Sequence, residues 1–227
     1  MRDDPNALMI FAAGFGTRMA PLTDTVPKPL IPVAGKALLD HALDPAQALG
    51  LGPVAVNAHY RADQIVAALS GTDVTVLREE PEVLDTGGGL KAALAVLTGD
   101  AVMTMNADAV WNGPNPYAVL RAAWDPEAMD ALLLCVPMAR AWGRADAGDF
   151  TVRDGGRPVR GPGWVYCGAQ IIKSAVIGAV PDRVFGLNRV WDELMDQDRL
   201  RVADYPGQWC DVGRPSSIPL AEEMLRV

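Results

Sequence analysis

A glycine-rich segment near the N-terminus is followed by two basic side chains, in a chain whose net charge is −8. The segment begins Gly14-Phe15-Gly16-Thr17-Arg18, and further along the chain Lys28 stands between two prolines. Glycines let a backbone approach a phosphate closely, and the prolines hold the lysine on a stiff, extended stretch. Because the chain has only four lysines, this pattern predicts that Arg18 and Lys28 bind phosphate. A tight turn beside two solvated cations is the alternative.

Several familiar motifs do not fit this sequence. In the dinucleotide fingerprint GxGxxG the third glycine would fall at Met19, and neither the Gly-Lys-Ser/Thr of a P-loop nor a Gly-x-Ser-x-Gly elbow is present. The chain has two histidines, His41 and His59, and neither is predicted to be catalytic. The residues therefore fit phosphate chemistry assisted by cations and a metal ion better than serine hydrolysis.

A carboxylate follows one of the apolar runs. The sequence Asn106-Ala107-Asp108 closes a run that starts at Ala101, so Asp108 is expected at the carboxyl end of a buried strand. Ligands of open α/β sheets bind outside that end, and Mg²⁺ prefers carboxylate oxygens. Asp108 is thus a candidate magnesium ligand, with a turn or helix cap as the alternative.

The elements that position these residues alternate between strand and helix patterns. Continuous apolar runs indicate strands at residues 7–12, 53–58, 74–77, 101–106 and 131–136. Apolar residues at helical spacing lie between them, at residues 38–49, 65–69 and 90–97. The order predicts an α/β fold, a three-layer αβα sandwich with a mostly parallel, Rossmann-like central sheet.

The second half of the chain is less regular. Residues 143–163 hold six glycines and two prolines and are expected to form loops around a short strand near Phe150. An apolar stretch at 165–172 follows, and helices are expected near 188–195 and 215–225. Since no repeat or linker divides the chain, residues 1–227 are predicted to form a single domain.

Composition excludes several classes of function. A net negative surface repels nucleic acid and anionic lipid, so neither is expected as a partner. Three widely spaced cysteines indicate buried thiols in a reducing compartment, and no apolar run reaches the ~20 residues of a membrane span. The acidic start, residues 1–5, is unlike a signal peptide. A cytoplasmic protein is expected.

The N-terminal segment resembles the signature of sugar-phosphate nucleotidyltransferases over residues 12–33, which run Ala12-Ala13-Gly14-x-Gly16-x-Arg18-x-x-Pro21-Leu22-Thr23 and then Pro27-Lys28-Pro29-Leu30-x-Pro32-Val33. The resemblance implies the nucleotide-diphospho-sugar transferase fold and the joining of a nucleoside triphosphate to a sugar 1-phosphate, with release of pyrophosphate. It implies Mg²⁺ as cofactor, and a monomer or small homo-oligomer is expected.

The same resemblance assigns roles to individual residues. Arg18, Lys28 and Asp108 are implied as catalytic, and Asp108 and Asp211 as metal ligands, although Ala107 and Arg214 replace residues usual beside these two aspartates. Nucleotide contacts are implied at Ala12, Ala13, Gly14, Gly16, Thr17, Asn57, Thr86, Gly87, Gly88 and Asn106. Contacts to the sugar are expected at Gly148, Asp149, Gly168 and Asn188.

The choice of substrate depends on a triple glycine. Leu84-Asp85-Thr86-Gly87-Gly88-Gly89 resembles a segment of the family's short uridylyltransferases, in which bare backbone is expected to lie against the base. Side chains added at Gly87 or Gly88 would then project into the base pocket. UTP is the expected donor and N-acetylmuramate 1-phosphate one expected acceptor. The alternatives are cytidylyl or guanylyl transfer to another phosphorylated small molecule, or a silent nucleotide-sugar-binding domain.

Overall fold

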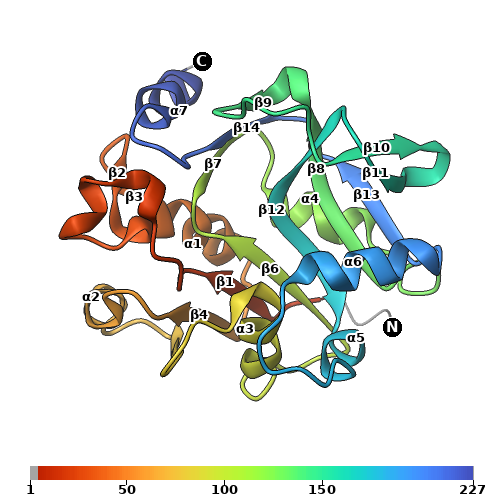
Figure 1. The fold of residues 1–227 in the computed structure, drawn as a ribbon, viewed down its shortest axis with the longest axis horizontal. Coiled ribbons are helices and arrows are strands. Elements are labelled where there is room, and N and C mark those ends of the chain that lie inside the picture. Colours follow the sequence, from red (N-terminus) through yellow and green to blue (C-terminus); the bar gives the residue numbers. More distant parts are fainter. Residues whose placement is uncertain (1–4, 227) are drawn as a thin grey trace.

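Residues 5–226 are described by a computed structural model, and their centre is a nine-stranded sheet (Figure 1). Its fully parallel part has the order β6-β1-β4-β5, with bounds Ala101–Asn106, Leu8–Phe11, Val54–Ala58 and Thr75–Arg78. In β1, Leu8 and Ile10 pack into one core while Met9 packs into the other. These strands are apolar throughout because both faces of the sheet are covered. The first four predicted strands are confirmed.

One long strand runs against the others. Strand β12 (Trp164–Lys173) is antiparallel to both β6 and β8 (Ala131–Pro137), and β13 (Leu200–Asp204) is parallel to β8. It follows that β8 and β13 point the same way as the parallel strands, so the sheet is mostly parallel, as predicted. A hairpin of β10 (Phe150–Arg153) and β11 (Arg157–Arg160) pairs with the start of β12. The reversal at β12 was not predicted.

Helices cover both faces of the sheet, which confirms the three-layer sandwich. Buried side chains of α1 (Leu38–Ala48), α2 (Ala62–Ala68) and α4 (Pro116–Ala123) pack in one core. Those of α3 (Asp85–Ala93), α5 (Ser174–Gly178) and α6 (Leu187–Asp196) pack in the other. In Figure 1, α6 crosses in front of the strands and α4 lies behind them.

A small three-stranded sheet joins the two halves of the chain beside the main sheet. Its order is β7-β14-β9, with bounds Ala109–Asn112, Gln208–Asp211 and Ala141–Trp142. Helix α7 (Ser217–Arg226) packs its buried Ala221 and Met224 against this sheet. The pairing sets Asp211 opposite Ala109, and the amide of Val212 donates to the Asp108 carbonyl over 2.9 Å. The two aspartates are therefore brought together by this sheet.

The remaining elements are short. Strands β2 (Pro32–Val33) and β3 (Lys36–Ala37) form a hairpin, and single 3-10 turns occur at Thr17–Met19, Leu22–Asp24, Lys28–Leu30, Met138–Arg140 and Asp154–Gly156. Helix α3 ends at Ala93, not Leu97, and begins at Asp85, so the triple glycine lies inside it.

The structure also bears on the compositional predictions. The three cysteines are free and buried, as predicted. None of the helices within residues 5–226 has the length and apolar character that crossing a bilayer requires. Most of the acidic N-terminal segment, on which the expectation of no signal peptide depends, lies outside the described residues.

Candidate active site

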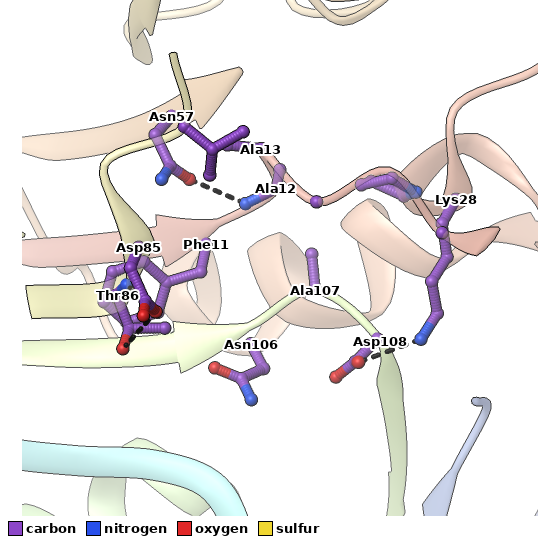
Figure 2. A pocket seen from close by; sticks show the side chains of 14 residues that line it. Phe11, Ala12, Ala13, Lys28, Asn57, Asp85, Thr86, Asn106, Ala107 and Asp108 are labelled. Carbon is purple, nitrogen blue, oxygen red and sulfur yellow. Dashed lines mark hydrogen bonds and ion pairs between the residues drawn. The ribbon is translucent and has the colours of Figure 1, made fainter. Parts of the chain in front are cut away.

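The carboxyl ends of β1, β4 and β6 border a cavity of about 240 Å³, termed here the first cavity. This is the edge of an open α/β sheet at which ligands bind. Of the residues predicted to contact the nucleotide, its lining contains Ala12, Ala13, Gly14, Gly16, Asn57, Thr86 and Asn106, together with Lys28 and Asp108 (Figure 2). The structure thus gathers residues from five separate segments around one space.

The glycine loop passes close to the lysine. Gly16 has φ of 63°, and a Cβ added to it would lie 2.9 Å from the Cβ of Lys28. Only glycine combines this left-handed conformation with so close an approach. Thr17, which begins the 3-10 turn after Gly16, lies outside the linings of the first cavity and of the cavity next to it.

Lys28 and Asp108 form an ion pair in the lining of the first cavity. The Lys28 ammonium donates to Asp108 Oδ2 over 2.9 Å, and the lysine side chain is mostly buried. Figure 2 shows the two side chains converging from the loop after β1 and from the end of β6. The pair places one fixed positive charge beside the carboxylate predicted to bind the metal.

The charges of Lys28 and Asp108 also act on the Asp211 carboxyl. Burial, and next the negative charge of Asp108, raise the pKa of the Asp211 carboxyl, while Lys28, Arg144 and Arg18 oppose that rise. Two carboxylates that repel each other across a short space are stabilised by a cation between them. A cation between Asp108 and Asp211 would relieve the repulsion that, together with burial, raises the pKa of Asp211.

The donor set can be tested against Mg²⁺. Within residues 5–226, no group of three or more histidine, cysteine or acidic side chains could hold a metal. Mg²⁺ bound beside phosphates uses one or two carboxylates and completes its shell with water and phosphate oxygens. Asp108 and Asp211 supply hard oxygen donors of that kind and number, so the residues fit Mg²⁺.

A second cavity, of about 360 Å³, adjoins the first. Four residues line both: Asp85, Thr86, Asn106 and Asp108. The second cavity is also lined by the predicted residues Arg18, Asp149, Gly168, Asn188 and Asp211. A molecule in one cavity would thus meet a molecule in the other at the wall that carries Asp108.

Asp149 holds the wall of the second cavity in place. Its Oδ1 accepts from Arg144 over 3.1 Å and its Oδ2 from the Tyr166 amide over 2.9 Å. Arg144 is also paired with Asp146. Since both carboxylate oxygens already have protein partners, Asp149 fixes the positions of Arg144 and β12.

Asn188 is held in a similar way at the far end of the second cavity. Its side-chain oxygen accepts from Arg160 over 3.1 Å, and Arg160 is paired with Asp192. The guanidinium carbon of Arg160 lies 4.9 Å from the ring centre of Phe150 and 5.9 Å from that of Trp191. Stacking and ion pairing together hold this cation at the cavity wall.

Glycines shape the boundary between the cavities. Strand β12 shifts register between Tyr166 and Ala169, and Gly168, with φ of 82°, approaches Asn106 so closely that an added Cβ would lie 2.9 Å from its Cβ. Gly148 packs on the backbone of Trp164 and lies outside both linings. Gly168 therefore sets the position of Asn106, whereas Gly148 shapes only the loop.

The prediction that side chains added at Gly87 or Gly88 would project into the base pocket is wrong. Both are buried in α3, and their amides donate to the Phe185 carbonyl. A Cβ added at Gly87 would lie 2.3 Å from the Phe185 ring, and one at Gly88 would lie 2.3 Å from the Arg183 carbonyl oxygen. Added side chains would thus collide with the segment before α6 and would not project into a cavity.

Three charged lining residues were not predicted. Asp85 has φ of 60° and lines both cavities, and Arg144 and Arg160 line the second. Asp85 stands directly before Thr86, so its place in the motif was a usable signal. The two arginines lie in a stretch rich in glycine, where no periodicity indicates which side chains face inward.

Known proteins resemble this chain in sequence and in fold. It is 37% identical over 239 residues to N-acetylmuramate alpha-1-phosphate uridylyltransferase of Caulobacter vibrioides, covering 99% of each chain. A second such uridylyltransferase, of Neisseria meningitidis serogroup B, is 32% identical and covers 90% of this chain and 92% of its own. The inositol-1-phosphate CTP transferase of T. maritima shares the fold, with TM-score 0.79, 13% identity and coverage of 100% and 97%.

The fold, the adjoining cavities and these relatives define the class. This is a sugar-1-phosphate nucleotidyltransferase with the nucleotide-diphospho-sugar transferase fold. The chain belongs to the MobA-like NTP transferase domain family, whose model matches residues 8–159.

Proposed function

We propose that this chain transfers a uridylyl group from UTP to N-acetylmuramate 1-phosphate. A phosphate oxygen of the sugar 1-phosphate attacks the α-phosphorus of UTP, the bond from that phosphorus to the bridging oxygen breaks, and pyrophosphate leaves. The observation that carries this proposal is the wall shared by the two cavities, with Asp108 on it. The nucleotide would occupy the first cavity and the sugar phosphate the second.

The attacking group is already an anion, so the reaction needs no strong base. The difficulty is the approach of two polyanions and the charge that grows on the leaving pyrophosphate. In our proposal Lys28 and Arg18 offset that charge, and the glycine loop donates backbone amides to the phosphates. Asp108 and Asp211 would hold Mg²⁺, which supplies charge neutralisation at the transferring phosphate when bound.

The second cavity carries features that suit an acidic sugar. N-acetylmuramate bears a carboxylate on its lactyl group, and such a group is bound best by a guanidinium. Arg144 and Arg160 both line the second cavity. Their pairing with protein carboxylates holds them in fixed positions, which reduces the entropy lost on binding.

The proposal extends to the setting of the reaction. UTP and a sugar 1-phosphate would be the partners, with no role for nucleic acid or a membrane. Because nucleoside triphosphates are made in the cytoplasm, we place the reaction there. We also propose that residues 1–227 act as one domain.

A screen of pyrophosphate release tests this proposal. Four nucleoside triphosphates are crossed with a panel of sugar 1-phosphates, with N-acetylglucosamine 1-phosphate as the matched neutral acceptor. We expect UTP with N-acetylmuramate 1-phosphate to give the highest kcat/KM. Equal or better turnover of the neutral acceptor would reject the sugar, and preference for CTP or GTP would reject the base. No turnover of any pair would leave a binding domain as the function.

A further inference from the structure

A chain of buried hydrogen bonds runs behind the first cavity and joins three segments that border it. The Ala12 amide donates to Asn57 Oδ1 over 2.7 Å, and Asn57 Nδ2 donates to Glu79 Oε1 over 2.7 Å. The second Glu79 oxygen accepts from the Leu84 amide over 2.8 Å. Asn57 is 4% exposed and Glu79 is 3% exposed. Figure 2 shows the first of these bonds, between β4 and the loop after β1.

The direction of these bonds imposes a requirement on Glu79. Both ends of the chain are backbone amides, Ala12 and Leu84, which can only donate. The Asn57 side chain accepts at one end and donates at the other, so the next group must accept from both sides. A carboxylate is the side chain that does this, because an amide always presents one donor. Glutamine at position 79 would leave two donors facing each other, whichever way either amide is turned.

The third glycine of the triple belongs to the same arrangement. A Cβ added at Gly89 would lie 2.7 Å from Glu79 Oε1 and 2.9 Å from Asn57 Nδ2. Helix α3 can therefore lie directly on the Asn57–Glu79 pair only because this position has no side chain. The carbonyl of Glu79 also contacts His59 Nδ1 at 2.7 Å, and the His59 ring packs edge-on against Phe15 of the glycine loop.

We propose that Glu79 is a positioning residue for the nucleoside triphosphate. It lies outside the lining of the first cavity, yet it fixes the separation between the glycine loop at Ala12 and the start of α3, which carries Asp85 and Thr86 into the cavity. This inference rests on the proposed function in one respect, namely that the first cavity binds the nucleotide. The four hydrogen-bonded groups, at Ala12, Asn57, Glu79 and Leu84, are termed here the relay. None of them lines the second cavity, so the relay acts directly on the first cavity and reaches the second only through Asp85 and Thr86.

Two isosteric substitutions test the direction of the relay. In E79Q the facing donors push the two backbone segments apart, and nucleotide binding must bring them back together. In N57D two carboxylates face each other. The double variant N57D/E79Q restores complementarity, because the carboxylate introduced at position 57 accepts from the Ala12 amide and from the glutamine, and the glutamine oxygen accepts from the Leu84 amide. E222Q is the matched control, since Glu222 accepts only the Ala34 amide, on the β2–β3 turn.

The readouts are nucleotide affinity by calorimetry, the KM values of both substrates and the melting temperature. We expect the unsatisfied donors in E79Q to weaken triphosphate binding about tenfold or more. KM for the sugar 1-phosphate should rise by a smaller factor, because no group of the relay lines the second cavity. Since Asn57 itself lines the first cavity, N57D/E79Q is compared with N57D, which carries the same new carboxylate. We expect the double variant to bind the nucleotide more tightly than N57D and to melt at a higher temperature, and E222Q to bind like the wild type. If E79Q does not fold, the double variant carries the test and must fold and bind the nucleotide more tightly than N57D.

Each other outcome has a defined meaning. A lower melting temperature in E79Q with both KM values unchanged would show that Glu79 is merely structural and overturn the proposal. A double variant that binds no better than N57D would overturn it as well. If the wild type binds a triphosphate other than UTP, the proposal that UTP is the donor is rejected. The variants are then compared with the nucleotide that does bind, and the inference about Glu79 is still tested. Wild-type protein that binds none of the four would overturn both proposals.

Discussion

The Lys28 ammonium donates to the Asp108 carboxylate over 2.9 Å, so a residue assigned to the triphosphate is paired with a residue assigned to the metal. The lysine is mostly buried and the aspartate about one-third exposed. Removal of either partner would leave the other charge partly buried and without a counter-charge, which is unfavourable. Substitutions at these two positions are therefore expected to be coupled.

Asp108→Asn is expected to abolish most turnover. It removes a carboxylate from the proposed metal site and the partner of Lys28 at once. The loss of several kcal/mol of transition-state stabilisation corresponds to a fall in kcat of about a thousandfold or more. Steady-state rates over a magnesium titration measure this.

The control for that variant is Asp63→Asn, which removes an exposed carboxylate paired with Arg78. It should leave turnover unchanged. An Asp108→Asn protein that keeps more than about a tenth of wild-type turnover would show that Asp108 does not anchor the metal.

Lys28→Ala and Arg18→Ala are expected to lower kcat more than they raise KM. Charge on the leaving pyrophosphate grows in the transition state, so a cation there acts mainly on the chemical step. Lys36→Ala, at an exposed pair with Asp44, is the matched control. A raised KM with unchanged kcat would assign the two cations to uniform binding.

Base preference is expected to follow the hydrogen-bonding edge of the base. UTP should be used best and dTTP second, since the two present the same Watson–Crick edge. CTP presents an amino donor at ring position four, where UTP has a carbonyl acceptor, and so leaves a buried group unpaired. That costs about 1–3 kcal/mol, or roughly a tenfold to hundredfold loss in kcat/KM. Competition assays among triphosphates measure the order, and GTP or ATP used equally well would contradict it.

Two glycine substitutions should affect different properties: Gly87→Ala the stability of the fold, and Gly14→Ala the binding of nucleotide. A Cβ at Gly87 would collide with the Phe185 ring, so Gly87→Ala is expected to lower the free energy of unfolding by about 1–3 kcal/mol. Gly14 lines the first cavity, and a Cβ added to it meets nothing within 4 Å. Gly14→Ala should therefore leave the melting temperature unchanged and weaken nucleotide binding. Thermal unfolding and calorimetry on both variants test this contrast, and a destabilised Gly14→Ala would refute it.

Local pattern was enough to predict the parallel half of the sheet. Runs such as that of β1 are apolar at every position because they are covered on both faces, and this signal needs no knowledge of distant residues. Helix α4 was missed although its start is marked, since Asn115 accepts from the amides of Tyr117 and Ala118 and Pro116 takes the first position. That omission was avoidable.

Other features depend on contacts between distant parts of the chain. Strand β12 is apolar like its neighbours, and its sequence carries no sign of its reversed direction. Glu79 stands in the charged run Arg78-Glu79-Glu80, which is typical of a solvated surface, and only the folded chain shows that it is buried against Asn57. Likewise, the contact of Gly88 with the Arg183 carbonyl requires a segment that lies far along the chain.

The pairing of β14 with β7 has a consequence for the order of events during translation. The loop after β1, the end of β4 and the end of β6 are all made early, whereas Asp211 reaches Asp108 only after β14 has been synthesised and paired. A nascent chain can thus contain every segment that lines the first cavity while it still lacks one of the two proposed acidic ligands. With the proposed metal site, a chain that stops short of β14 is expected to bind nucleotide without turning it over.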